Sequence, residues 1–202
     1  DYVDRSMLHI PEECFQSADL SELFDFGQFD LAMSLEVAEH LPESVADGFI
    51  KSLTKASDRV VFSAAHPGQG GIDHVNEQWP SYWASKFREH GYVAVDCFRP
   101  QIWKDQEVRL CYRHNVILFL KESRVPEGLN SVSHISSLDL VHPEKWQRLR
   151  DPLSISSGSP ASQLGIRGGA RAVGFGLLSI ANGTARKLRR SLSGSEADNE
   201  SS

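Results

Sequence analysis

Two carboxylates and an imidazole follow a short apolar run in the segment FDLAMSLEVAEHLPE, residues 29–43. Glu36, Glu39 and His40 follow in quick succession, just before Pro42. Such groups accept hydrogen bonds, exchange protons and bind cations, and burying them without partners costs free energy. The spacing therefore predicts that a buried strand ends here and presents polar groups where the chain leaves it.

A second group of reactive side chains lies in the loop HPGQGGIDHVNEQW, residues 66–79, among glycines that permit close approach to a ligand. Histidine titrates near neutral pH, so His66 or His74 could accept a proton from an oxygen or nitrogen atom of a substrate. A metal site formed by His66, Asp73 and His74 is the weaker interpretation, because their spacing is not that of a zinc motif. We therefore predict a catalytic loop without a metal ion.

Simpler structural roles stay open for several of these residues. Glu36 and Glu39 are also typical of solvated acids in the first turn of a helix, where the helix dipole favours negative charge. His40 could be a local cap, and Asp19 could cap the segment SELF that follows it. The residue types alone do not decide between the two interpretations.

Alternating strand and helix patterns must position these groups. Short apolar runs predict strands, and apolar residues at helical spacing predict helices. The expected strands are residues 29–35, 59–65, 92–98 and 115–120, and the expected helices are residues 42–57 and 80–91. This order is typical of an α/β domain whose parallel or mixed sheet is covered by helices on both faces. The last two strands follow each other without a helix between them, which predicts an antiparallel pair.

The polar clusters all lie where predicted strands end, and ligands of open α/β sheets bind beyond the carboxyl ends of the strands. In this order the segments resemble the second half of a class I S-adenosylmethionine-dependent methyltransferase of the bacterial small-molecule type. SLEVAEHL is similar to the end of that family's fourth strand, which often reads as an apolar run followed by E-x-x-E-H. HVNEQWPSYWASKFREHGY and CYRHNVILFL resemble its fifth-to-sixth strand connection and its seventh strand.

The resemblance implies a Rossmann-like methyltransferase domain over residues 1–122, with S-adenosylmethionine as cofactor and a small-molecule acceptor methylated on oxygen or nitrogen. The family's glycine-rich loop would precede this segment, so we expect an N-terminally truncated form of the domain. By resemblance, Asp19 would accept a hydrogen bond from the adenine amino group, and Leu20 would contact the ring. The other implied cofactor-binding residues are Ser34, Leu35, Glu36 and His40. The implied catalytic residues are His74 and His66, and the implied substrate-binding residues are Asn76 and Glu77.

Composition narrows the functional classes. The net charge of −6 argues against a nucleic-acid partner or a general membrane-surface binder, because both are anionic. No apolar run approaches the roughly 20 residues that span a bilayer. Cys14, Cys97 and Cys111 are scattered, which is typical of reduced, mostly buried thiols in a cytoplasmic protein.

Serine and glycine dominate the chain beyond about residue 122, which predicts a boundary near 122–126 and a largely disordered tail over residues 123–202. Residues 140–146 could be a short docking element. Residues 164–192 end in basic side chains, but membrane contact through this segment is less favoured than a disordered linker, because its glycines oppose a helix.

Two other functions stay open. The sheet could serve as a non-catalytic interaction module. It could also belong to a nucleotide-binding or dinucleotide-binding enzyme, which would require a G-x-G-x-x-G segment upstream.

Overall fold

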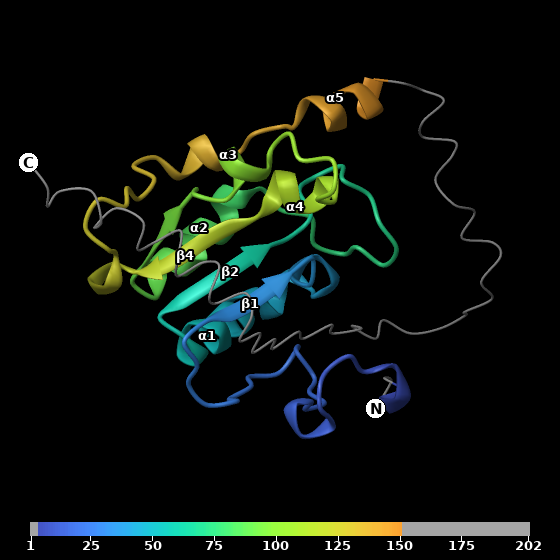
Figure 1. Cartoon of the computed structure of the whole chain (residues 1–202), viewed down its shortest axis with the longest axis vertical. Coiled ribbons are helices and arrows are strands. Elements are labelled where there is room, and N and C mark those ends of the chain that lie inside the picture. The colour runs from blue at the N-terminus through green and yellow to red at the C-terminus, as the bar shows by residue number, and fades with distance from the viewer. Residues whose placement is uncertain (1–3, 151–202) are drawn as a thin grey trace, which may run out of the picture.

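A four-stranded mixed sheet forms the centre of the protein in the computed structural model, which describes residues 4–150 (Figure 1). The strands are β1 (Ala32–Leu35), β2 (Arg59–Ser63), β3 (Tyr92–Val95) and β4 (Ile117–Lys121). Their order across the sheet is β1-β2-β4-β3. β1 and β2 run parallel, and β4 is antiparallel to both of its neighbours. The predicted α/β class and the antiparallel pairing of the last two strands are confirmed.

Helices join the strands at most of the expected places. They are α1 (Ala46–Ala56), α2 (Pro80–Glu89), α3 (Arg99–Ile102), α4 (Leu110–Asn115) and α5 (Pro143–Arg150). Short 3-10 turns span Arg5–Met7, Glu12–Cys14, Ala38–His40, Glu43–Val45, Glu122–Arg124 and Ile135–Leu138. The prediction that no helix separates the last two strands is wrong, because α3 and α4 lie there. Each is too short to show an apolar period in the sequence.

Aromatic side chains fill the core between the sheet and the pair α1 and α2, which lies behind the strands in Figure 1. The rings of Phe87 on α2 and Phe119 on β4 are stacked with centroids 3.9 Å apart, and Phe62 on β2 meets Phe87 edge-on at 5.4 Å. The other face carries the half-buried Met33 and Leu35 of β1. No described helix lies over β1 on that face, so the expected covering of both faces by helices is incomplete at β1.

The segment that follows β4 packs against the domain, although its composition predicts a tail. Leu138 is 1% exposed and belongs to the core. The Val132 N–H donates to the Ala94 carbonyl at 2.8 Å, and the Ser81 hydroxyl donates to Asp139 at 2.6 Å. The boundary predicted near residue 122 therefore falls inside the folded unit. Residues 151–202, including the basic segment 164–192, lie outside the described residues.

The three cysteines differ in their exposure to solvent. Cys97 and Cys111 are half-buried, whereas Cys14 is exposed, so the expectation of buried thiols is wrong for Cys14. All three are free thiols. Within residues 4–150, no helix has the length and apolar character that a membrane crossing requires.

Candidate functional site

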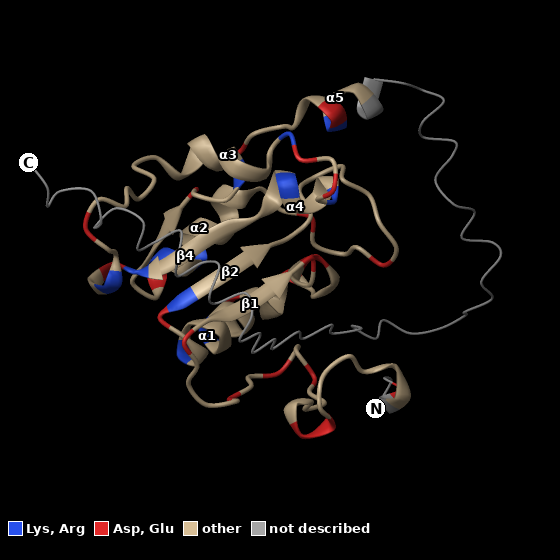
Figure 2. Cartoon of the chain, viewed as in Figure 1, with Lys and Arg blue, Asp and Glu red and all other residues tan. Residues whose placement is uncertain are grey.

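The chain makes a sharp bend at Glu36, where it leaves β1. Glu36 has a positive φ of 54°, a conformation that costs a non-glycine residue roughly 1–2 kcal/mol. Its N–H donates to the Ser63 carbonyl at 2.9 Å and lies 3.1 Å from the Ser63 hydroxyl oxygen, at the end of β2. Because β1 and β2 are parallel, this bend lies at their shared carboxyl edge, where Figure 2 shows acidic residues on the turn after β1.

The Glu36 carboxylate belongs to a closed network of three side chains. Its Oε2 accepts from Gln69 Nε2 at 2.8 Å, and its Oε1 accepts from Asn115 Nδ2 at 3.1 Å. Asn115 Nδ2 also donates to Gln69 Oε1 at 2.8 Å. These hydrogen bonds join three separate segments at the edge: the turn after β1, the loop 66–79 and the end of α4. The alternative of a solvated Glu36 therefore does not describe this structure.

Glu39 is the most unusual group at the edge. Its side chain is fully buried, and neither carboxyl oxygen has a hydrogen-bond partner among the described residues. Burial, reinforced by the negative charge of Glu36, raises the pKa of Glu39 to about 8. Its backbone carbonyl accepts the N–H groups of Val75 and Asn76 at 2.9 and 3.0 Å, so the loop covers it. The interpretation of Glu39 as a solvated acid is wrong.

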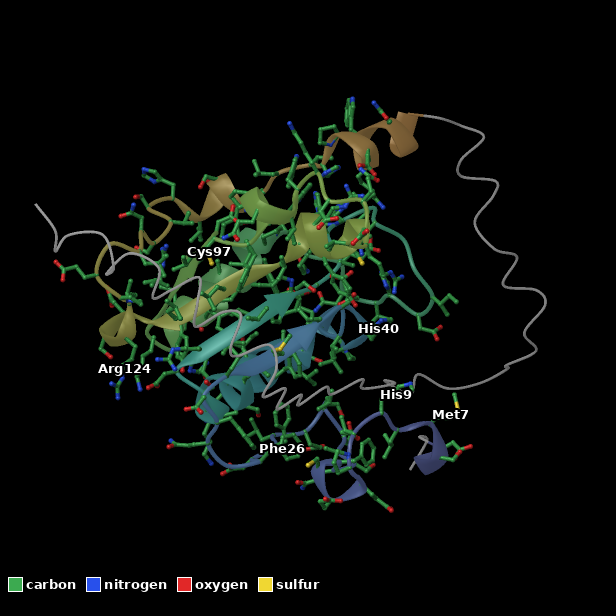
Figure 3. The ribbon with its side chains drawn as sticks, in the orientation of Figure 1. Met7, His9, Phe26, His40, Cys97 and Arg124 are labelled. Atoms are coloured by element: carbon green, nitrogen blue, oxygen red, sulfur yellow. The ribbon has the colours of Figure 1, made fainter. Side chains whose placement is uncertain are left out.

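Two imidazoles lie beside Glu39. His74 Nδ1 is 2.8 Å from Glu77 Oε1, and its Nε2 is 4.0 Å from Glu39 Oε1. His40, labelled in Figure 3, has its Nδ1 3.3 Å from the Asp73 carbonyl oxygen. The two rings meet edge-on with centroids 4.9 Å apart. One ligating atom from each of Glu39, His40 and His74 lies within 4.8 Å of the other two.

Glu77 organises the loop that supplies His74. Its carboxylate accepts the N–H groups of Gly68 and Gly70, each at 2.8 Å, in addition to the contact with His74. Burial opposes ionisation, but these hydrogen bonds prevail and lower the pKa of Glu77. A Cβ placed on Gly71 would lie 2.2 Å from His74 Nε2, so the imidazole occupies space that only glycine leaves open. The implied substrate residue Glu77 therefore has its hydrogen bonds within the loop.

His66 borders a cleft of about 460 Å³ next to the edge. Its ring is 1% exposed, stacks on Trp79 with centroids 5.7 Å apart and lies 4.3 Å from the ring of His114. Burial and the neighbouring His114 lower the pKa of His66 to about 4. Polar side chains dominate the rest of the wall, including Gln69, Arg109, Arg113 and Lys145. The cleft suits a polar ligand that meets a neutral imidazole.

The remaining residues implied by the resemblance are spread over three environments. Asp19 is exposed, and its Oδ1 accepts the N–H and hydroxyl of Ser21 at 2.9 and 2.6 Å, which is the local capping role. The Leu20 side chain belongs to the core. Ser34 is buried, and its hydroxyl has no partner among the described residues, whereas Leu35 is half-buried. The edge thus gathers the residues after β1 and β2 but not the side chain of Asp19.

Sequence reasoning missed several residues of the edge. Gln69, His114 and Asn115 all contribute to it. Asn76, which the resemblance did imply, is buried there with its Nδ2 unpartnered among residues 4–150. One signal was present in the sequence. If the last strand is antiparallel, its amino end must meet the carboxyl ends of its parallel neighbours, which brings His114 and Asn115 to the edge.

Comparison with protein-family models, with curated proteins and with solved structures found no match for this chain. The arrangement of the residues at the edge is therefore what indicates a function. That arrangement offers hydrogen-bond acceptors, two imidazoles and a polar cleft at one edge of an α/β sheet, which suits ligand binding and group transfer.

Proposed function

We propose that the chain forms the second half of an S-adenosylmethionine-dependent methyltransferase that transfers a methyl group to oxygen or nitrogen of a small-molecule acceptor. The observation that carries the proposal is the position of the segment SLEVAEH, which resembles the E-x-x-E-H segment of class I methyltransferases. It begins in β1 and bends at the carboxyl edge beside the parallel β2. Such edges are where open α/β sheets bind their ligands.

The chemistry of methyl transfer is compatible with this edge. In the proposed reaction S-adenosylmethionine would supply the methyl group from its sulfonium, the acceptor oxygen or nitrogen would give up a proton to solvent, and S-adenosylhomocysteine would remain. Such a displacement depends chiefly on holding the two reactants in line. The Glu36 carboxylate would favour the cationic sulfonium nearby, and Ser34 and Leu35 would flank it in this proposal.

The acceptor would occupy the polar cleft beside His66. With its pKa lowered to about 4, His66 is neutral at pH 7 and is only a weak base. His74 has its Nδ1 committed to Glu77. In the proposed reaction, holding the reactants in line therefore contributes more to the rate acceleration than removing a proton does.

The adenine end of the cofactor would meet Asp19 and Leu20. Both hydrogen bonds from Ser21 go to Oδ1 of Asp19, so Oδ2 is the atom that would accept from the adenine amino group. Leu20 would contribute its backbone N–H, since its side chain packs in the core. We place this activity in the cytoplasm, without a nucleic-acid or membrane partner.

Calorimetric titration with S-adenosylhomocysteine tests the proposal, both on this chain and on the product of its complete reading frame. We expect the Glu36→Gln and Asp19→Ala variants of the binding form to lose at least tenfold in affinity. Glu43→Gln, which changes an exposed carboxylate after Pro42, should bind as the parent does. No heat from the complete product would overturn the proposal, and heat with NAD in its place would favour a dinucleotide enzyme.

A further inference from the structure

We propose that Glu39, His40 and His74 form a binding site for a divalent transition-metal ion, with zinc as the reference ion. This inference goes beyond methyl transfer and does not depend on it. The three side chains come from the turn after β1 and from the loop 66–79, which hydrogen bonds from Val75 and Asn76 to Glu39 hold together.

The donor atoms are already close enough to share one ion. One ligating atom from each side chain lies within 4.8 Å of the other two, and His74 Nε2 is 4.0 Å from Glu39 Oε1. Two atoms that each bind an ion at about 2.0–2.2 Å can be separated by up to roughly 4.4 Å. Small side-chain movements therefore complete the site. Two imidazoles and one carboxylate suit zinc and its neighbours in the first transition series.

The Glu39 carboxyl group is separate evidence that a ligand is missing from this site. It is fully buried, it lies 4.0 Å from an imidazole nitrogen, and neither oxygen has a well-formed hydrogen bond among the described residues. The backbone N–H groups of Glu39 and Ala65 lie near enough to favour the charged carboxylate, but burial outweighs them. Burying a carboxyl group in this way costs free energy unless a cation or a donor satisfies it. A bound metal ion would satisfy the Glu39 carboxyl group without any further donor from the protein.

The hydrogen bonds of the two histidines leave the correct nitrogen for a metal. His74 Nδ1 faces a Glu77 oxygen, and His40 Nδ1 faces the Asp73 carbonyl oxygen. Both partners are acceptors, so each Nδ1 is the nitrogen that donates to them, and each Nε2 is the nitrogen left for a metal ion. Metal-binding histidines are typically oriented by such partners.

The loop holds this arrangement before any ion binds. Gly68 and Gly70 donate to Glu77, which fixes the partner of His74. Asp73, which holds His40, has a positive φ of 58°. Three protein ligands would leave at least one coordination position for water or a polar ligand. The nearby carboxylates of Glu36 and Glu77 add negative charge that favours a cation.

Cobalt and zinc titrations of the full chain, freed of metal by a chelator, test the proposal. We expect one ion per chain, visible d–d absorption with Co²⁺ and no thiolate-to-cobalt charge-transfer band, because no ligand is a cysteine. Glu39→Gln and His74→Ala should each weaken zinc binding at least 100-fold. His134→Ala removes an exposed histidine outside the group and should leave the affinity unchanged.

Thermal unfolding separates metal binding from folding. Glu39→Gln replaces a buried carboxyl group that lacks partners with a neutral amide of the same shape, so the metal-free variant should be at least as stable as the parent. Saturating zinc should raise the Tm of the parent and leave that of Glu39→Gln unchanged. The proposal fails if the parent binds no zinc, if a thiolate band appears, or if zinc raises both Tm values equally.

Discussion

The buried guanidinium of Arg99 donates a 2.8 Å hydrogen bond to the backbone carbonyl of Leu138. Its other nitrogens hold both carboxyl oxygens of Asp96, at 2.9 and 2.7 Å. A charged group after β3 thus reaches across to a stretch of sequence rich in serine. This contact makes residues beyond β4 part of the folded unit.

Shortening Leu138 tests that attachment. Leu138→Ala should lower the free energy of unfolding by about 2–5 kcal/mol, because it removes a buried side chain and leaves a cavity. Leu140→Ala is the matched control, since Leu140 is 43% exposed and should change stability by about 0.5 kcal/mol or less. Urea unfolding of both variants measures the difference. Equal, small effects would show that the segment does not contribute to the core.

The ion pair of Arg113 with Glu144 predicts a pH dependence of stability. Hydrogen bonds from Arg113 and then Gln106 lower the pKa of Glu144 from 4.5 to about 2. The unfolded carboxylate takes up its proton first as the pH falls, so the stabilisation is complete above about 4.5 and is lost toward 2. Glu144→Gln should therefore be less stable than the parent at pH 6. The gap in unfolding free energy should narrow as the pH falls from 5 to 3, and a gap of constant size would contradict the assignment.

His66 should resist protonation. Burial and the neighbouring His114 lower its pKa from 6.5 to about 4, so its ring should remain neutral at pH 5 in a nitrogen-15 NMR titration. The unfolded chain binds this proton near 6.5 and the native chain only near 4, so the group makes stability fall as the pH drops through that window. Protonation of His66 near 6.5 would mean that the ring reaches water.

Gly71→Ala should displace an imidazole without changing any polar group. The new methyl group would lie 2.2 Å from His74 Nε2, so the ring must shift, which should disturb its contacts with Glu77 and Glu39. The side-chain NMR signals of His74 should shift, and zinc binding should weaken. Gly48→Ala is the control, because its Cβ meets only Leu23 at an ordinary 3.5 Å in α1. There alanine should stabilise the helix by up to about 1 kcal/mol, and unchanged His74 signals in Gly71→Ala would refute the close approach.

The elements that the sequence predicted well are those with a local signature. β1, β2, α1 and α2 combine an apolar run or stripe with a boundary residue such as Pro42 or Pro80, and each lies within its expected range. The short α3 and α4 carry no such signature, because four to six residues do not complete two helical turns.

The misjudged features depend on contacts between distant segments. Leu138 is a single apolar residue in a polar stretch, and only the packing around Arg99 and the core reveals its role. The burial of Glu39 depends on a loop that begins 27 positions further along the chain. By contrast, His74 and Glu77 are three residues apart, so their contact can be predicted from the local sequence.

Glu36 and Asp73 are the non-glycine residues with a left-handed backbone among residues 4–150, and both serve the same edge of the sheet. Glycine or asparagine would relieve the strain at either position. Selection for thermal stability alone would therefore favour substitutions at these two positions. Such selection would yield a more stable protein. At position 36, however, glycine or asparagine would remove the carboxylate that accepts hydrogen bonds from Gln69 and Asn115 and organises the edge.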